Sequence, residues 1–177
     1  MNAQQIIWVP ALAFTFIAGW LDWRTRLIPN WLTMSGIGFG FALHFYTAGW
    51  RGAAASAEGM GLALALLLPL VLLRALGAGD WKLMGAAGAL LGPAMLLFVL
   101  LASILVSGGM AAVRMVAAGR VRATIQNIVA LVRGFALIGL RPNPEISLDN
   151  PQLLKLPFGV AAAAGTLLCF LAARWAR

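Results

Sequence analysis

The sequence is poor in the residues that most often build catalytic and metal sites. Among 177 residues there is one cysteine and one histidine. A lone cysteine forms neither an intrachain disulfide nor a paired-cysteine metal site, and one histidine, His44, counts against histidine-based metal centres and Ser-His-Asp triads. No metal site is therefore expected. Because His44 lies inside an apolar run, it is expected to be a hydrogen-bonded interior residue.

Charge is also scarce, and acidic residues are the scarcest. Only 10% of the residues are charged, with five acidic residues in all, whereas 62% are hydrophobic. A soluble domain is usually about 45–50% apolar and about 25% charged. The composition therefore predicts an integral membrane protein whose solvent is the lipid bilayer. The net charge of +8 lies in loops between apolar runs, as in other membrane proteins, so nucleic acid is not an expected partner.

The apolar runs predict an all-α, polytopic helix bundle that forms a single domain over residues 1–177. A membrane-spanning helix needs about 20 apolar residues. The expected spans are 5–21, 31–49, 59–76, 83–92 with a turn, 94–118 and 156–173. The intervening segment 119–155 is expected to be a cytoplasmic loop, in which 125–140 could form a helix lying along the membrane interface.

The uncharged run 83–113 is divided into two spans for a physical reason. As one straight helix it would be about 46 Å long, too long for one untilted crossing. Gly92 and Pro93 form a natural break. The division also gathers most of the 13 basic residues on one face, which is taken as cytoplasmic. Six spans with both termini on the non-cytoplasmic side follow.

Two carboxylates stand out because ionisable groups beside a membrane are costly and suggest function. Asp22 and Asp80 each lie at the predicted cytoplasmic edge of an apolar run. A structural role is open for each: Asp22 could pair with Arg26, and Asp80 could pair with Lys82 or cap the next helix. The other acidic residues lie in predicted loops: Glu58, Glu145 and Asp149.

Two carboxylates facing each other could hydrolyse a peptide bond. They would share one proton, so that the ionised group activates water while the protonated group donates to the substrate carbonyl. This chemistry needs no metal, histidine or cysteine. Gly77 and Gly79 carry no side chains beside Asp80, and so could let a substrate backbone approach.

Three blocks of the sequence resemble those of the type IV prepilin peptidases, which are membrane aspartic peptidases with a GxGD motif. DWRTRLIPN (22–30) resembles the first block, GAGDWKL (77–83) the GxGD block, and LPFGVAAAAG (156–165) the third. They occur in the family's order. The third block has valine after Pro-Phe-Gly, where many members have proline.

The resemblance implies a peptidase that cuts the leader from prepilins at the cytoplasmic face of the bacterial inner membrane, with Asp22 and Asp80 as catalytic residues. Many members carry a cysteine-containing insert between the first spans and methylate the new N-terminus. This sequence lacks the insert and resembles the short branch associated with Flp/Tad-type pili. Neither methyltransferase activity nor a cofactor is expected. The expected partners are a prepilin-like substrate and other pilus-assembly proteins.

Other residues of these blocks could support the two aspartates or shape the neighbouring turns. Arg26 and Lys82 could tune the aspartates or be topology charges of their loops. Pro29 and Asn30 are expected to shape the turn and cap the next helix. Because 83–92 is too short to cross the bilayer alone, Asp80 is expected in a water-filled cavity below the membrane surface, unless the turn lies inside the protein.

Two other classes of function compete with the peptidase. A small proton- or ion-conducting protein could use Asp22 and Asp80 as relay groups, although no acidic chain continues to the far face. A structural subunit would use the motifs only to shape loops. A cleavage assay on variants of the two aspartates separates these classes.

Overall fold

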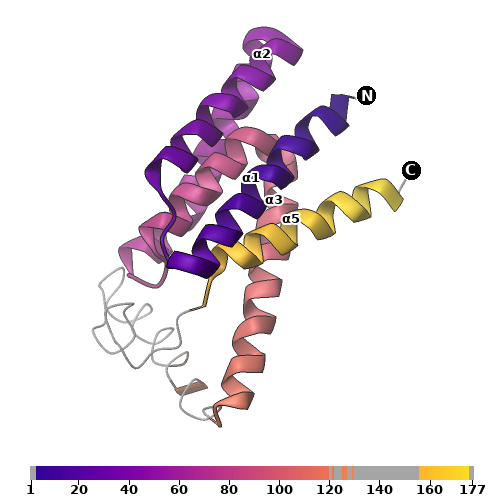
Figure 1. Cartoon of the computed structure of the whole chain (residues 1–177). Coiled ribbons are helices and arrows are strands. Elements are labelled where there is room, and N and C mark those ends of the chain that lie inside the picture. The colour runs from indigo at the N-terminus through magenta and orange to yellow at the C-terminus, as the bar shows by residue number, and fades with distance from the viewer. Residues whose placement is uncertain (1–2, 120, 122–124, 127–128, 130–155, 176–177) are drawn as a thin grey trace.

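The computed structural model is built from helices (Figure 1). It describes residues 3–119, 121, 125, 126, 129 and 156–175, and no strand occurs among them. The helices are α1 (Ala3–Thr25), α2 (Asn30–Leu72), α3 (Ala78–Ala117) and α5 (Phe158–Trp175). Most of the predicted loop 119–155, with its interfacial helix, lies outside the described residues.

All four helices are long and apolar enough to cross a membrane, with mean hydropathies of 1.5, 1.8, 2.6 and 1.5. The prediction of an all-α membrane protein is therefore confirmed. Many large apolar side chains face outward, as expected for surfaces in contact with lipid rather than water; examples are Phe16, Phe39, Phe98 and Leu105. Six separate spans and the placement of the termini stay predictions.

Helix α2 contains a break at Ala48 and Gly49. Gly49 has a φ of 59° and a ψ of −142°, a conformation that glycine adopts easily because it lacks a Cβ. Before the break, α2 runs in the same direction as the start of α3. Lys82 Nζ donates to Asn30 Oδ1 at 3.1 Å, and further along a Cβ on Gly40 would lie 2.7 Å from the Ala89 backbone.

After the break, α2 runs in the opposite direction along the same part of α3. Ser56 Oγ donates to the Ala89 carbonyl at 2.8 Å, whereas Trp81 Nε1 donates to the carbonyl of Leu64 at 2.8 Å. Contacts nearer the C-terminus of α2 thus reach residues nearer the N-terminus of α3. Helix α2 is therefore a helical hairpin that holds the first half of α3 between its arms.

The polar stretch 51–58 is helical, which corrects the expectation of a loop before a span at 59. The described helix runs from Asn30 to Leu72, and its only non-helical residues are Ala48 and Gly49. The stretch RGAAASAE is rich in alanine, the best helix former, so it continues the second arm of the hairpin. Glu58 accordingly lies exposed on a helix rather than in a loop.

The break that the sequence predicts in α3 is present at Gly92, with a φ of 74° and a ψ of 172°. In an intact helix the carbonyl of residue 89 would accept from the N–H of residue 93, but Pro93 has none. Ser56 supplies that donor. His44 Nε2 bonds the adjacent Leu90 carbonyl at 3.0 Å, which confirms His44 as a buried, hydrogen-bonded residue.

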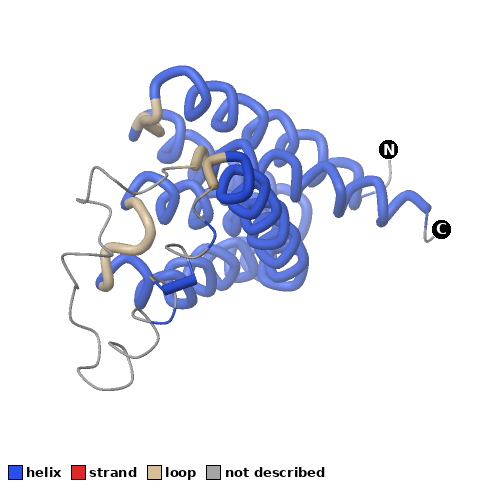
Figure 2. The backbone as a smooth tube through the Cα atoms, turned by 90° about the horizontal axis from the view of Figure 1, so that it is seen from below, coloured by secondary structure: helices blue, strands red, loops and turns tan. Residues whose placement is uncertain are grey.

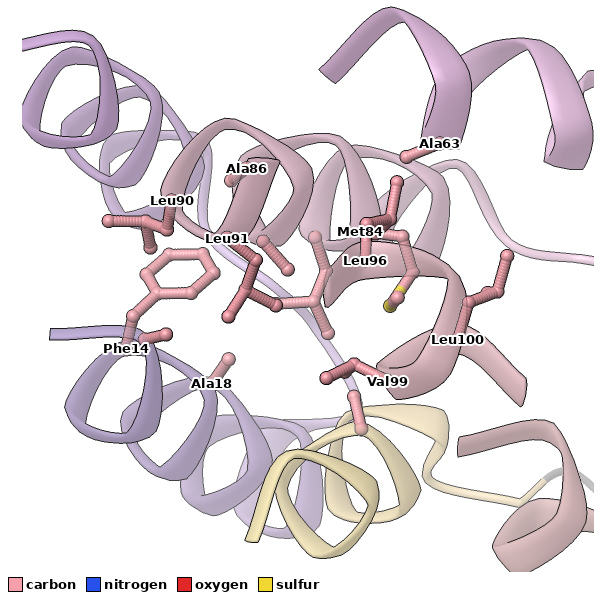
Figure 3. Packing of buried hydrophobic residues seen from close by; sticks show 14 of the residues in the cluster. Phe14, Ala18, Ala63, Met84, Ala86, Leu90, Leu91, Leu96, Val99 and Leu100 are labelled. Carbon is pink, nitrogen blue, oxygen red and sulfur yellow. The ribbon is translucent and has the colours of Figure 1, made fainter. Parts of the chain in front are cut away.

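The first half of α3 is the centre of the bundle, because every residue from Leu83 to Gly92 is buried. Its side chains meet Phe14 and Ala18 of α1 on one side and Ala63 of α2 on another (Figure 3). The second half of α3 packs against α5, where a Cβ on Gly165 would lie 2.5 Å from Ser103 Oγ. Small residues thus let the helix backbones approach closely, as in other membrane bundles. Figure 2 shows the same helices from below.

Candidate active site

A cavity of about 590 Å³ lies where the end of α1, the starts of α2 and α3 and the residues before α5 come together. Asp22 and Asp80 both line it. Ser107 lines it too, although a straight helix would put residues 80 and 107 about 40 Å apart. The break at Gly92 therefore turns α3 back, so that both its arms reach the cavity.

Every residue that the sequence proposes for the site lines this cavity except Pro29. The cavity-lining members of that set are Asp22, Arg26, Asn30, Gly77, Gly79, Asp80 and Lys82. Pro29 is the residue that precedes α2, with φ −67° and ψ 143°. It shapes the turn next to the cavity without lining it.

Asp22 is held in the last turn of α1 by contact with α5. The residue is 6% exposed, and its Oδ2 accepts a hydrogen bond of 2.8 Å from the backbone N–H of Gly159. Gly159 lies in the first turn of α5, where backbone N–H groups have no partner within the helix. The Asp22 carboxylate therefore serves as a cap for α5 and joins two helices far apart in the sequence.

Gly159 must lack a side chain for this contact to form. A Cβ at Gly159 would lie 2.9 Å from Asp22 Cβ and 3.1 Å from its Oδ2, and a Cβ on Gly19 would lie 3.0 Å from the Gly159 carbonyl oxygen. Sequence reasoning missed Gly159 as a site residue. The available signal is the glycine in the block LPFGVAAAAG, for which the sequence alone suggests no role.

Asp80 lies in the first turn of α3 with fewer constraints. The residue that precedes α3 is Gly77, and no side-chain hydrogen bond caps the helix, so Asp80 does not act as the cap considered from sequence. A Cβ on Gly77 would lie 3.2 Å from Asp80 Oδ2, whereas one on Gly79 would meet Ile28 at an ordinary 3.6 Å. Gly77 is thus the glycine that leaves space directly beside the carboxyl group.

Lys82 and Asn30 connect the starts of α2 and α3. Lys82 directs its ammonium to Asn30 Oδ1, and no ion pair between Lys82 and Asp80 occurs in the described part of the chain. The expectation that Asn30 caps α2 is wrong, because Pro29 precedes the helix and Asn30 is its first residue. Asn30 instead uses its side chain to bind α3.

Arg26 ends α1 in a left-handed conformation, with a φ of 55°. Its backbone N–H donates to the Asp22 carbonyl at 3.0 Å, which closes the last turn of α1. Glycine is the usual residue at such a helix end, because a side chain there costs energy. An arginine in this position therefore carries a local backbone cost while its side chain lines the cavity.

The arrangement supplies two carboxyl groups and one hydroxyl group around a single cavity, on a scaffold of packed helices. Such a site can bind a polar segment, and paired carboxyl groups can exchange protons with water and a carbonyl group. Ser107 is the polar cavity residue that sequence reasoning missed. It lies 27 positions beyond Asp80 inside an apolar run, and only the reversal of α3 places it here.

Comparison with known families agrees with this picture. The model of the type IV leader peptidase family matches residues 10–112. The matched segment includes most of α1, all of α2 and most of α3, and hence both aspartates, and it ends before α5. No curated protein and no solved structure matches the chain.

Proposed function

Because the chain belongs to the type IV leader peptidase family, we propose that it removes the leader peptide of Flp-type prepilins, with Asp22 and Asp80 as its catalytic pair. The observation that carries the proposal is that both aspartates line one cavity although 57 residues separate them in the sequence. Family membership favours this function over the proton- or ion-conducting protein that the same carboxylates would allow.

Cleavage proceeds with the pair sharing one proton. The ionised carboxylate takes a proton from water as the water oxygen bonds to the scissile carbonyl carbon, and the protonated carboxyl group gives its proton to the carbonyl oxygen. The resulting diol then collapses. One carboxyl group protonates the departing nitrogen, the other takes the proton back from the diol, and the C–N bond breaks.

The helix lengths support a site below the membrane surface that opens to the cytoplasm. The first half of α3, from Ala78 to Leu91, is about 21 Å long, shorter than the roughly 30 Å of hydrocarbon in a bilayer. Asp80 at its start therefore lies within the depth of the membrane, where only a protein-lined cavity admits water. Together with α1 and α5, the two arms of α2 and the two arms of α3 give six membrane segments, of which the first arm of α3 spans only part of the bilayer, and both termini lie on the opposite face.

The substrate is a prepilin whose leader reaches the cavity from the cytoplasm while its apolar helix lies in the bilayer. The segment between α1 and α2 runs only from Arg26 to Pro29, which supports the short branch without the insert that accompanies N-methylation. Pilus-assembly proteins of the same system are the further partners of this enzyme.

Co-expression of a Flp-type prepilin with the peptidase tests the proposal. Wild-type protein is expected to shorten the prepilin, and Asp22→Ala and Asp80→Ala are each expected to leave it uncut. Glu58→Ala is the matched control, because it removes an exposed acidic residue of α2 that does not line the cavity. Cleavage that survives either aspartate substitution in membrane-inserted protein would contradict the two-aspartate mechanism.

A further inference from the structure

Ser107 differs from every other serine and threonine of the described chain in its hydrogen bonding. The others each donate to a backbone carbonyl, which satisfies a hydroxyl group in apolar surroundings. They are Thr15, Thr25, Thr33, Ser35, Thr47, Ser56, Ser103 and Thr166. Among the described residues, the Ser107 hydroxyl has no hydrogen-bond partner.

Ser103 shows that a serine on this helix can bond to the helix's own backbone. Ser103 lies one turn earlier on the same helix, is fully buried, and donates to the Val99 carbonyl at 2.6 Å. The same bond to the residue four positions back is open to any helical serine, yet Ser107 does not make it. Ser107 is partly exposed and lines the cavity with Asp22 and Asp80. Its hydroxyl group is therefore available to donate to a molecule that occupies the cavity.

We propose that Ser107 binds the substrate by donating a hydrogen bond from its hydroxyl group to a main-chain carbonyl of the peptide next to the scissile bond. This inference rests on the proposed peptidase function. A peptide backbone presents carbonyl acceptors, and the absence of a side chain at Gly77 leaves room for that backbone beside Asp80. The aspartates approach the peptide from α1 and from the first half of α3, whereas Ser107 approaches from the second half.

Such a contact forms when the peptide binds and persists through the reaction, so its loss should raise KM and leave kcat nearly unchanged. The expected effect of Ser107→Ala is a rise in KM of roughly tenfold, the size of one well-made hydrogen bond. Ser107→Thr keeps a hydroxyl group, so its KM should stay within about threefold of the wild-type value. Ser103→Ala, the matched control on the same helix, should leave both constants unchanged because its hydroxyl does not reach the cavity.

The measurement uses the full-length protein in lipid vesicles with a purified Flp-type prepilin, and determines kcat and KM for the wild type and these three variants. A KM of Ser107→Ala within twofold of wild type, or a fall in kcat alone, would overturn the substrate-binding role. If the aspartate variants are inactive while Ser107→Ala has wild-type KM, only this inference fails. If the wild type does not cleave, or an aspartate variant does, the proposed function fails and the inference with it.

Discussion

Asp22 and Asp80 line the same cavity but are held in different ways. Asp22 is built into the bundle: it is 6% exposed and accepts the Gly159 N–H at 2.8 Å. Asp80 is half-buried, and its carboxyl group has no hydrogen-bond partner among the described residues. Gly159 of α5 brings its backbone N–H close to the Asp22 carboxyl group, whereas Gly77 leaves space beside the Asp80 carboxyl group.

The two aspartates therefore contribute differently to the stability of the bundle and to the proposed reaction. Asp22 fixes the position of α1 against α5 and so has a structural role in addition to the proposed catalytic one. Asp80 contributes little to packing, which leaves its carboxyl group available to substrate and water. In the proposed reaction, Asp22 is the carboxyl group that the packing holds in place, and Asp80 is the one that can exchange hydrogen bonds with substrate and water.

The largest expected difference in stability is between the two alanine variants. Asp22→Ala removes the acceptor of a buried N–H, which should cost about 2–3 kcal/mol in the free energy of unfolding. Asp80→Ala removes no hydrogen bond of the described chain and should change that energy by less than about 0.5 kcal/mol. Thermal unfolding of both variants in detergent micelles measures this contrast. Equal losses of stability would contradict the division of roles.

The conservative variant Asp22→Asn distinguishes the structural role of Asp22 from its proposed catalytic role. Its amide oxygen can still accept from the Gly159 N–H, so about half of the lost stability should return. Cleavage should stay abolished, because an amide cannot take a proton from water. The same micelle unfolding and prepilin cleavage assays report both quantities. Recovery of cleavage in this variant would show that Asp22 acts only as a structural cap.

A smaller effect is expected at Gly159. Gly159→Ala would place a Cβ 2.9 Å from Asp22 Cβ, forcing α1 and α5 apart at a cost of about 1–3 kcal/mol and displacing the Asp22 carboxyl group. The same substitution at Gly38, which has nothing within 4 Å, is the control and should not destabilise the protein. Wild-type stability and cleavage in Gly159→Ala would show that the contact does not position Asp22.

The smallest effect is expected at Lys82, beside Asp80. Lys82→Ala removes an exposed hydrogen bond to Asn30, worth about 0–1 kcal/mol at a surface position. Prepilin cleavage by this variant should stay within a few-fold of wild type if Lys82 only connects α2 and α3. A loss of cleavage as large as that of Asp80→Ala would instead place Lys82 in the catalytic step.

The features that sequence predicts well here depend on local chemistry. The membrane class follows from composition, and the break in α3 follows from Gly92 and Pro93, because each is set by the residues at that place. The prediction of a loop at 51–58 is wrong. The polar residues of this stretch favour a loop, whereas its alanines sustain a helix that packs on α3.

The features that sequence missed depend on contacts between distant segments. Gly159 meets Asp22 across 137 positions, and Ser107 reaches the cavity only because α3 reverses direction. No periodicity or motif within either segment reveals these contacts. The pairing of Asp22 with Asp80 stays a prediction from topology and a family resemblance, and the packed bundle adds that both residues line one cavity.

Chemical cross-linking between positions 22 and 80 tests the shared cavity most directly. The variant carries Asp22→Cys, Asp80→Cys and Cys169→Ser, so that only the two introduced thiols are present, and it is treated in membranes with a short bifunctional thiol reagent. We predict efficient intramolecular cross-linking, and none when Glu58→Cys replaces Asp80→Cys. Failure to cross-link positions 22 and 80, while a monofunctional reagent labels both thiols, would contradict the account.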